Sequence, residues 1–323
     1  MLTKRINFVN FKKKYKKKSI EIRLKNLIKK KSDLINSLSV NYKDSYNKNL
    51  LKKFKNSKYF RIIGMGGSIL GTQAIYNYLN DKIKKKFVFI NNLQTVEKKF
   101  KKKSFTNLVV SKSGTTIETI VNSNILLKKG DKNIFITENK KNYLYFLAQK
   151  LKSEIVHHNN FIGGRYSVLS EVGMLPAELM GLSSKNFRQF NFLIKNKKFL
   201  NSLVYNVGSI LFYIKNKKYN SIIINYDETA EDIFKWYQQL VAESLGKHKK
   251  GILPIVSNMP KDNHSVMQLY LDGFKNNFYT FFYTNELKSE SLKSSQILSS
   301  QKFLRGKNLS NIMYAQKIAT ENI

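Results

Sequence analysis

Short apolar runs alternate with stretches of helical spacing along the first half of the chain. Each run passes into turn-forming or polar residues, as in YFRIIGMGG, KKFVFINN, NLVVSKSGTT and NIFITEN. Apolar runs of this length, bounded by such residues, predict buried strands. Because the strands alternate with helices, the pattern predicts a parallel, doubly wound sheet.

The same pattern returns after residue 218. SIIINY predicts a strand, residues 228–247 predict a long helix, and GILPIVSN predicts the next strand. Residues 170–218 predict a helical bridge, and the Lys-, Asn- and Leu-rich start of the chain predicts helices that wrap a core found elsewhere. We therefore expect an α/β protein with an N-terminal helical extension at 1–55, a first domain at 56–185 and a second domain at 186–323.

Composition agrees with a globular protein of two domains. The chain has 323 residues, 42% of them hydrophobic, and can bury a sizeable core. No apolar stretch approaches the roughly 18 to 20 residues of a membrane span, so we expect a cytoplasmic protein that does not bind a membrane. The absence of cysteine excludes disulfides and thiolate zinc sites.

The net charge of +37 suggests nucleic acid as a partner, but the kind of basic residue argues against it. Only six of the 58 basic residues are arginine, which leaves 58 − 6 = 52 lysines. Base recognition favours arginine. Lys, Asn, Ile, Phe and Tyr share codons rich in A and T, so we attribute the charge to base composition and expect no nucleic-acid partner. The lysine runs at 12–18 and 98–104 are then predicted to be solvated faces.

The glycines of GMGGSILG, residues 64–71, follow a predicted strand and open a helix. Free backbone N–H groups and the positive end of the helix favour an anion there. A dinucleotide site fits poorly, because GxGxxG would need glycine at Ile69 and the next strand ends in Asn91 and Asn92, with no acidic side chain for a ribose. A tight turn without a ligand is the alternative.

Four hydroxyls surround a glycine in SKSGTTIET, residues 111–119, at the start of the next predicted helix. Hydroxyl and backbone N–H groups donate to phosphate oxygens, and glycine allows close approach. The spacing differs from that of a P-loop, and the small single phosphate of a sugar fits better than a nucleotide. A helix cap without a ligand would need only one Ser or Thr.

Arg165 follows two glycines in NFIGGRYSVLS, in a chain that otherwise uses lysine almost everywhere. A planar, delocalised cation can stabilise negative charge that develops on sugar oxygens. A structural ion pair is the alternative.

The predicted helix that ends at Gly246 carries one carboxylate among apolar positions. Ile233, Trp236, Leu240 and Glu243 recur at steps of three and four, so we expect Glu243 on the apolar stripe. Burial and the negative end of the helix would raise its pKa toward neutrality, as a general base requires. A carboxylate paired with a lysine is the alternative.

The four histidines predict no metal site. His157, His158, His248 and His264 lack the i, i+4 spacing of a helical metal pair. His264 follows the strand GILPIVSN, where a strand end meets the next helix, a usual place for catalytic groups in α/β proteins. A capping or surface histidine is an equal alternative.

Taken together, GMGGSILG, SKSGTTIET, GGRYSVLS, QQLVAESLGK and the HS of KDNHSVMQ resemble, in order and spacing, the motif series of glucose-6-phosphate isomerases. The resemblance implies two sugar isomerase (SIS) domains, each a parallel sheet flanked by helices, and usually a homodimer. It implies reversible isomerisation of glucose 6-phosphate and fructose 6-phosphate through a cis-enediolate, in glycolysis and gluconeogenesis, with no cofactor.

The resemblance also implies roles for single residues. Arg165 would stabilise the enediolate, Glu243 would shuttle the proton between C1 and C2, and His264 would help to open the ring, reaching into the partner subunit's site. The phosphate would be held by Ser111, Ser113 and Thr116, with Lys112, Thr115, Gly67 and Ser68 nearby.

Two departures accompany the resemblance. Glu171 stands where the family prefers a small residue. Family members also continue beyond IMYAQKIATENI into a further α/β portion whose lysine joins the site. We therefore expect the apolar residues of that last segment to need a further packing partner, the second sheet to have an uncovered edge, and turnover of cyclic substrate to be feeble.

Two other classes of protein are weighed against an isomerase. SIS domains also serve as sugar-phosphate sensors, but such regulators generally lack the GGR and ESxGK elements that this chain has. A nucleic-acid binder would show binding that falls steeply with salt and ignores glucose 6-phosphate.

Overall fold

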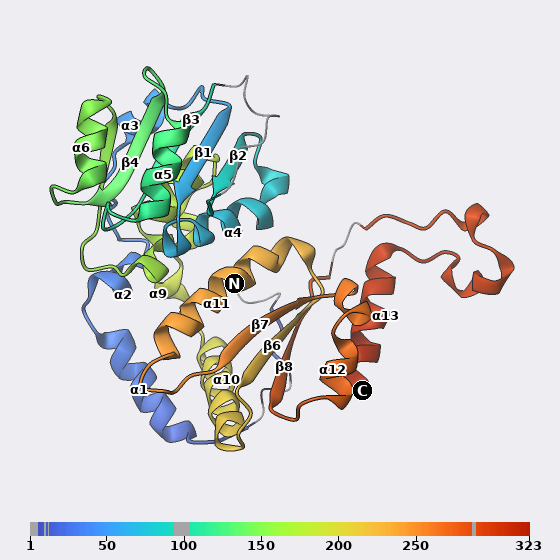
Figure 1. The fold of residues 1–323 in the computed structure, drawn as a ribbon. Helices are drawn as coiled ribbons and strands as arrows, with labels where there is room; N and C mark the ends of the chain where they lie inside the picture. The colour runs from blue at the N-terminus through green and yellow to red at the C-terminus, as the bar shows by residue number, and fades with distance from the viewer. Residues whose placement is uncertain (1–5, 10, 12, 94–103, 286–288) are drawn as a thin grey trace. The chain divides into compact units, whose positions relative to one another are not determined.

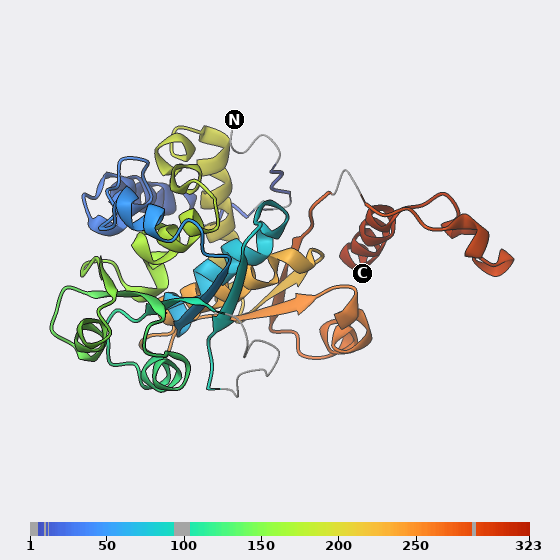
Figure 2. The ribbon, with the colours of Figure 1, turned by 90° about the horizontal axis from the view of Figure 1, so that it is seen from above.

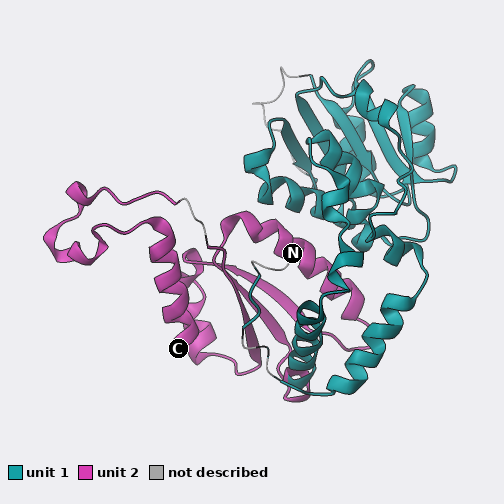
Figure 3. Ribbon diagram, turned by 180° about the vertical axis from the view of Figure 1, so that it is seen from behind, with its two compact units in different colours: residues 1–212 teal, residues 213–323 magenta. Residues whose placement is uncertain are grey.

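The structure, a computed structural model, describes residues 6–9, 11, 13–93, 104–285 and 289–323. It divides into two compact units, Met1–Phe212 and Tyr213–Ile323 (Figure 3). Both are α/β units with parallel sheets flanked by helices, which confirms the expected fold class. The lysine run at 98–104 lies almost wholly outside the described residues. In the run at 12–18, the described lysines are exposed except Lys17, which is half-buried.

Unit 1 is built on a sheet of five parallel strands in the order β2-β1-β3-β4-β5. The strands are β1 (Tyr59–Gly64), β2 (Lys86–Ile90), β3 (Thr106–Val110), β4 (Lys132–Glu138) and β5 (Glu154–His158). The first four were predicted from their apolar runs, whereas β5 was not. Chain order reverses between β1 and β3, and in open parallel sheets such a switch point is where ligands bind, outside the carboxyl ends of the strands.

Both faces of the unit 1 sheet are buried, as parallel sheets require. Ile63, Val109 and Phe135 pack in one core cluster with Leu126 of α5 and Leu144 of α6. These helices lie on one side of the sheet (Figures 1 and 2). The adjacent residues of the same strands point to the other face and are fully buried as well: Ile62, Leu108 and Ile134. The helices that follow β1, β3 and β4 are α4 (Leu70–Tyr78), α5 (Ile117–Leu126) and α6 (Tyr143–Lys150).

The rest of unit 1 is helical, as predicted. The N-terminal segment forms α1 (Lys17–Lys29), α2 (Asp33–Ser37) and α3 (Lys48–Lys53), and the bridge forms α7 (Glu171–Leu179), α8 (Ser184–Phe187), α9 (Phe190–Leu193) and α10 (Lys197–Lys215). The last of these crosses the boundary between the units. Lys17 Nζ of α1 donates to the hydroxyl of Tyr205 on α10 at 3.2 Å.

Unit 2 has three parallel strands in the order β7-β6-β8 (Figure 1). They are β6 (Asn220–Asn225), β7 (Leu253–Asn258) and β8 (Asn277–Phe282), with α11 (Glu231–Leu245), α12 (Met267–Asp272) and α13 (Leu309–Asn322). Only β8 was not predicted. Among the residues that the structure describes, no helix is long and apolar enough to cross a bilayer.

The last helix, α13, packs on the core of unit 2. Met313 lies against the cluster that contains Ile222 and Tyr226. The Tyr226 hydroxyl also lies 2.7 Å from Thr320 Oγ1. No residue of α13, all of which is described, is fully buried. The core of unit 2 therefore supplies part of the packing that the apolar residues of this segment were expected to need.

Candidate active site

Three of the motif loops lie at the carboxyl edge of the unit 1 sheet. The turn after β1 carries Gly67 and Ser68, the loop after β3 carries residues 111–116, and the segment after β5 carries Arg165. Since the carboxyl ends of parallel strands share one edge, the fold places these loops together, and β1 and β3 flank the switch point.

The turn after β1 is pressed against the segment that carries Arg165, residues 159–166, which we name the arginine loop. A Cβ added at Gly67 would lie 2.3 Å from the carbonyl carbon and oxygen of Gly164 and 2.6 Å from the backbone nitrogen of Arg165. No side chain fits in that space. The Ser167 hydroxyl lies 2.7 Å from Gly164 O and 3.3 Å from Gly67 O, and so bridges the same contact. The sequence proposed an anion site here, and the structure adds that the glycine permits two loops to touch.

The loop after β3 turns its hydroxyls in different directions. Ser111 is buried, accepts a hydrogen bond from Gly114 N–H at 3.2 Å, and lies 3.0 Å from the Thr116 hydroxyl. Ser113 and Thr115 are exposed, with their hydroxyls 3.1 Å apart. Ser111 therefore shapes the loop, while Ser113 and Thr115 present hydroxyls to solvent.

Two backbone features make this loop suitable for an anion. Gly114 has φ +67, in the left-handed region, and a Cβ there would lie 2.1 Å from Asn142 Oδ1. Thr116 is the N-cap residue of α5, yet its side chain accepts no hydrogen bond from the helix. The first N–H groups of α5 are thus not capped by that side chain, and an oxyanion can accept from them.

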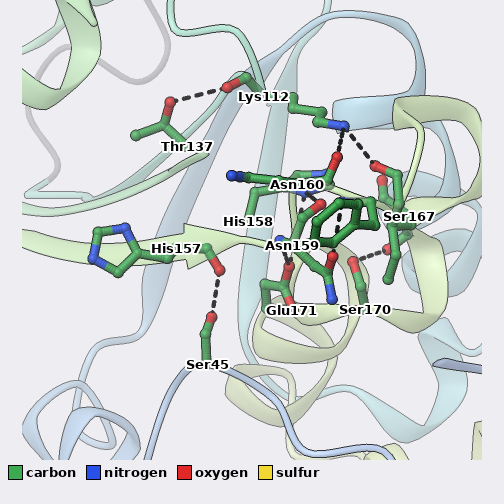
Figure 4. Close-up of polar contacts among 12 residues, drawn as sticks. Ser45, Lys112, Thr137, His157, His158, Asn159, Asn160, Ser167, Ser170 and Glu171 are labelled. Carbon is green, nitrogen blue, oxygen red and sulfur yellow. Dashed lines mark hydrogen bonds and ion pairs between the residues drawn. The ribbon is translucent and has the colours of Figure 1, made fainter. Parts of the chain in front are cut away.

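Lys112 joins the loop after β3, residues 111–116, which we name the phosphate loop after its expected ligand, to the arginine loop. Its ammonium donates to Asn160 O at 2.7 Å and to Ile162 O at 3.0 Å (Figure 4). Its own carbonyl accepts from the Thr137 hydroxyl at 3.2 Å. The expectation placed Lys112 beside the phosphate, and the structure shows that the side chain also links two loops.

Arg165 lies in the 3-10 helix Gly164–Leu169, with its guanidinium carbon 4.4 Å from the centroid of the Tyr166 ring. Stacking of this kind restricts a guanidinium without neutralising it. The structure brings Arg165 together with the Gly67 turn and, through Lys112, with the phosphate loop.

A buried polar network lies at the base of the arginine loop, around Asn159. Its N–H donates to Glu171 Oε1 at 2.6 Å, and its carbonyl lies 2.8 Å from His158 Nδ1. Tyr42 donates to Glu171 Oε2 at 3.3 Å. The side chains of His158 and Glu171 are each 1% exposed. Sequence reasoning noticed Glu171 only as a departure from the family pattern and did not predict this network.

Burial controls the ionisation of this pair. Desolvation lowers the pKa of His158 to about 4, although the Asn159 carbonyl opposes the change, so the ring is neutral at pH 7. A carbonyl can only accept, so Nδ1 carries the proton. Desolvation likewise raises the pKa of Glu171, and the Asn159 N–H opposes it. The 3.8 Å contact between the two side chains is therefore no ion pair at pH 7.

The other two catalytic candidates belong to unit 2. Glu243 lies in the last turn of α11, and its Oε1 accepts from Gln239 Nε2 at 2.7 Å. Its side chain is exposed, so the expected burial on an apolar stripe is wrong. Trp236 and Leu240 on the same stripe are only half-buried. The helix itself ends before Gly246, its C-cap, as predicted.

His264 is exposed at the end of the 3-10 helix Lys261–His264, directly after β7. Asp262 holds this turn to the strand by accepting from the N–H of Asn258 at 2.8 Å and from the Ser257 hydroxyl at 3.0 Å. The expected position between a strand end and the next helix is confirmed. In the described part of the chain, no group of three or more His, Cys, Asp or Glu side chains is arranged to hold a metal ion.

Comparisons with known proteins point to one family. The family model described as phosphoglucose isomerase matches residues 51–256. Glucose-6-phosphate isomerase of Methanocaldococcus jannaschii is 32% identical over 302 residues, which cover 87% of this chain and 74% of that protein. Glucose-6-phosphate isomerase of Staphylococcus saprophyticus is 30% identical over 285 residues, which cover 80% of this chain and 64% of that protein.

A solved structure shares the fold. The crystal structure of a glucose-6-phosphate isomerase from Chlamydia trachomatis aligns with a TM-score of 0.64 at 19% identity, covering 89% of this chain and 63% of that one. The match thus spans 63% to 74% of the length of these three proteins.

Proposed function

Because this chain belongs to the phosphoglucose isomerase family, we propose that it interconverts glucose 6-phosphate and fructose 6-phosphate, the reaction for which its relatives are named. One observation carries the proposal most strongly. The hydroxyl-rich loop after β3 and the arginine loop meet at the switch point of the sheet, and Lys112 joins them.

The phosphate of the substrate would sit at the start of α5. Ser113 and Thr115 offer exposed hydroxyls, Thr116 stands at the helix N-cap, and the first N–H groups of the helix favour an anion. Gly67 and Ser68 lie in the adjoining turn. A phosphate held there fixes the sugar by its C6 end and leaves the carbonyl end free to react.

Isomerisation requires a base and a place for negative charge. In the open-chain aldose, Glu243 would remove the C2 proton, and the electron pair moves to form the C1–C2 double bond of a cis-enediolate. Arg165 would stabilise the charge on the enediolate oxygens. The same carboxyl then returns the proton to C1, while the hydroxyl proton of O2 passes to O1, so that C1 bears a hydroxyl and C2 becomes the carbonyl of the ketose. The exposure of Glu243 leaves its carboxylate accessible to substrate.

His264 would transfer the proton between the ring oxygen and O1 when the cyclic sugar opens. We propose that it acts in the site of a second subunit, so that the working protein is a homodimer. We further propose that the protein works in the cytoplasm, because a phosphorylated sugar is charged and stays in the compartment where it is made.

The proposal is tested with fructose 6-phosphate in deuterium oxide. Wild-type protein should form glucose 6-phosphate in a coupled assay and exchange hydrogen at the reacting carbon. Glu243→Gln removes the base at nearly constant shape and should abolish exchange, while sugar-phosphate binding survives because the phosphate loop is intact. Glu231→Gln, on the same helix, is the matched control and should behave as wild type.

The outcomes separate the three classes of protein. Retained exchange in Glu243→Gln would remove this residue from the mechanism. Tight binding of glucose 6-phosphate without exchange in the wild type would favour a sensor. Salt-sensitive binding of DNA or RNA that ignores the sugar phosphate would favour a nucleic-acid binder.

A further inference from the structure

The arginine loop is held at several points by side chains of unit 1. Lys112 binds the carbonyls of Asn160 and Ile162, and Ser167 bridges Gly164 to the turn after β1. These contacts fix the middle and the end of the loop. Its start, at Asn159, is fixed separately.

Every polar group of Asn159 has a partner. Its N–H donates to Glu171, and its carbonyl accepts from His158 and from Ile162 N–H at 3.2 Å. Its side-chain nitrogen donates to Asp33 Oδ2 at 3.0 Å. Its side-chain oxygen accepts from the N–H of Phe161 at 2.9 Å. These hydrogen bonds fix the backbone and the side chain of Asn159, and so fix the direction in which the arginine loop leaves β5.

Glu171 contributes the shortest of these bonds and is itself well held. It is the first residue of α7, where a carboxylate interacts favourably with the positive helix end. Tyr42 donates to its second oxygen, and Tyr42 lies under the guanidinium of Arg188 with 4.9 Å between guanidinium carbon and ring centroid. A hydrogen bond to a buried carboxylate is stronger than an ordinary one.

We propose that Glu171, supported by Tyr42, is a positioning residue that fixes Asn159 and thereby aims the loop that carries Arg165. It touches no substrate and acts only through the loop. This inference rests on the proposed role of Arg165 in stabilising the enediolate. An arginine displaced by a fraction of an ångström loses much of its effect on a transition state while the phosphate is still held by other residues.

The test compares three variants with a matched control. Glu171→Ala removes both acceptor oxygens. Glu171→Gln keeps an acceptor oxygen for Asn159 N–H and should rescue. Tyr42→Phe removes only the hydroxyl that supports Glu171 and should give a smaller effect of the same kind. Tyr143→Phe, at an exposed tyrosine that starts α6, is the control.

Two readouts are taken on each protein. Amide hydrogen exchange reports on residues 159–166 directly, and Glu171→Ala should speed it about tenfold or more there while exchange in β3 and β4 is unchanged. Kinetics report on function, and Glu171→Ala should lower kcat about tenfold while KM for fructose 6-phosphate changes less than about twofold, since the lost interaction belongs to the transition state.

Several results would overturn the proposal. They are unchanged exchange at 159–166 in Glu171→Ala, faster exchange with kcat unaltered, faster exchange across the whole of unit 1, or a Glu171→Gln protein that behaves like Glu171→Ala. If the wild type shows no isomerase activity, the proposed function fails, and the exchange of residues 159–166 still decides whether Glu171 positions the loop.

Discussion

Single atoms decide the contact between the turn after β1 and the arginine loop. Gly67 faces the backbone of Gly164 with no room for a Cβ, whereas a Cβ added at Gly164 would meet nothing within 4 Å. The two glycines share one contact but only one of them requires its lack of a side chain.

This asymmetry gives the first prediction. Gly67→Ala must push the two loops apart and should lower the free energy of unfolding by about 2 kcal/mol, in the range for overpacked sites. Gly164→Ala should change it by less than about 0.5 kcal/mol. Urea titration of both variants checks this. Equal losses in the two variants would show that the contact is not as close as the structure has it.

The second prediction concerns His158 and acid. Burial depresses its pKa from the ordinary 6.5 to about 4. Between these two pH values the unfolded chain binds a proton at His158 and the folded chain does not, so acid favours the unfolded state. The contribution of His158 to stability is present above pH 6.5 and is lost as the pH falls toward 4. Between about pH 7 and pH 5, wild type should therefore lose about 2 kcal/mol relative to His158→Gln, whose amide is neutral throughout.

The control for this experiment is the adjacent residue. His157 is exposed on the other side of β5, and His157→Gln should reproduce the pH profile of the wild type. The comparison between variants also removes the opposing contribution of Glu171, whose raised pKa makes the folded state gain a proton first as the pH falls. Identical profiles for wild type and His158→Gln would contradict the buried, neutral ring.

At the scale of elements, the start of α5 is the clearest candidate for an anion site. We predict that Ser113→Ala combined with Thr116→Ala weakens the binding of glucose 6-phosphate by about 1 to 3 kcal/mol, the range for lost hydrogen bonds to a charged group. Titration calorimetry measures this. Ser202→Ala, whose hydroxyl only bonds within α10, should bind as wild type does. Unchanged affinity in the double variant would place the phosphate elsewhere.

The strands show what the sequence could reveal. Runs such as FVFI and LVV are apolar on both faces, so they indicate buried parallel strands without further information. β5 is an edge strand that alternates between exposed His157 and buried His158, and β8 starts with the polar residue Asn277. Neither contains an uninterrupted apolar run, so a criterion based on such runs missed both.

The candidate site divides in the same way. The loops after β1 and β3 were predicted because glycines and hydroxyls are local in sequence. The burial of Glu243 was predicted wrongly, because periodicity says which residues share a helix face and not whether another element covers it there. The role of Glu171 depends on Tyr42, 129 residues earlier, and no local pattern reveals such a pairing.

At the scale of the whole molecule, the proposed dimer makes a site from two chains. Glu243→Gln and His264→Gln should each be inactive on cyclic substrate. When the two proteins are dissociated and mixed, hybrid dimers should contain one intact site, and activity should return to about a quarter of the wild-type value. Native mass spectrometry verifies that hybrids form. Hybrids without activity would place His264 in the site of its own chain.

Lys112 has a consequence for the reactivity of the chain toward amine reagents. Most of the lysines that the structure describes are exposed, whereas the Lys112 nitrogen donates to two carbonyls and is less available to an electrophile. Lys112 should therefore be acetylated more slowly than the exposed lysines, whose acetylation rates serve as the internal reference. An acetyl group on Lys112 would show that its ammonium had left the carbonyls of Asn160 and Ile162, and so that the arginine loop had separated from the phosphate loop.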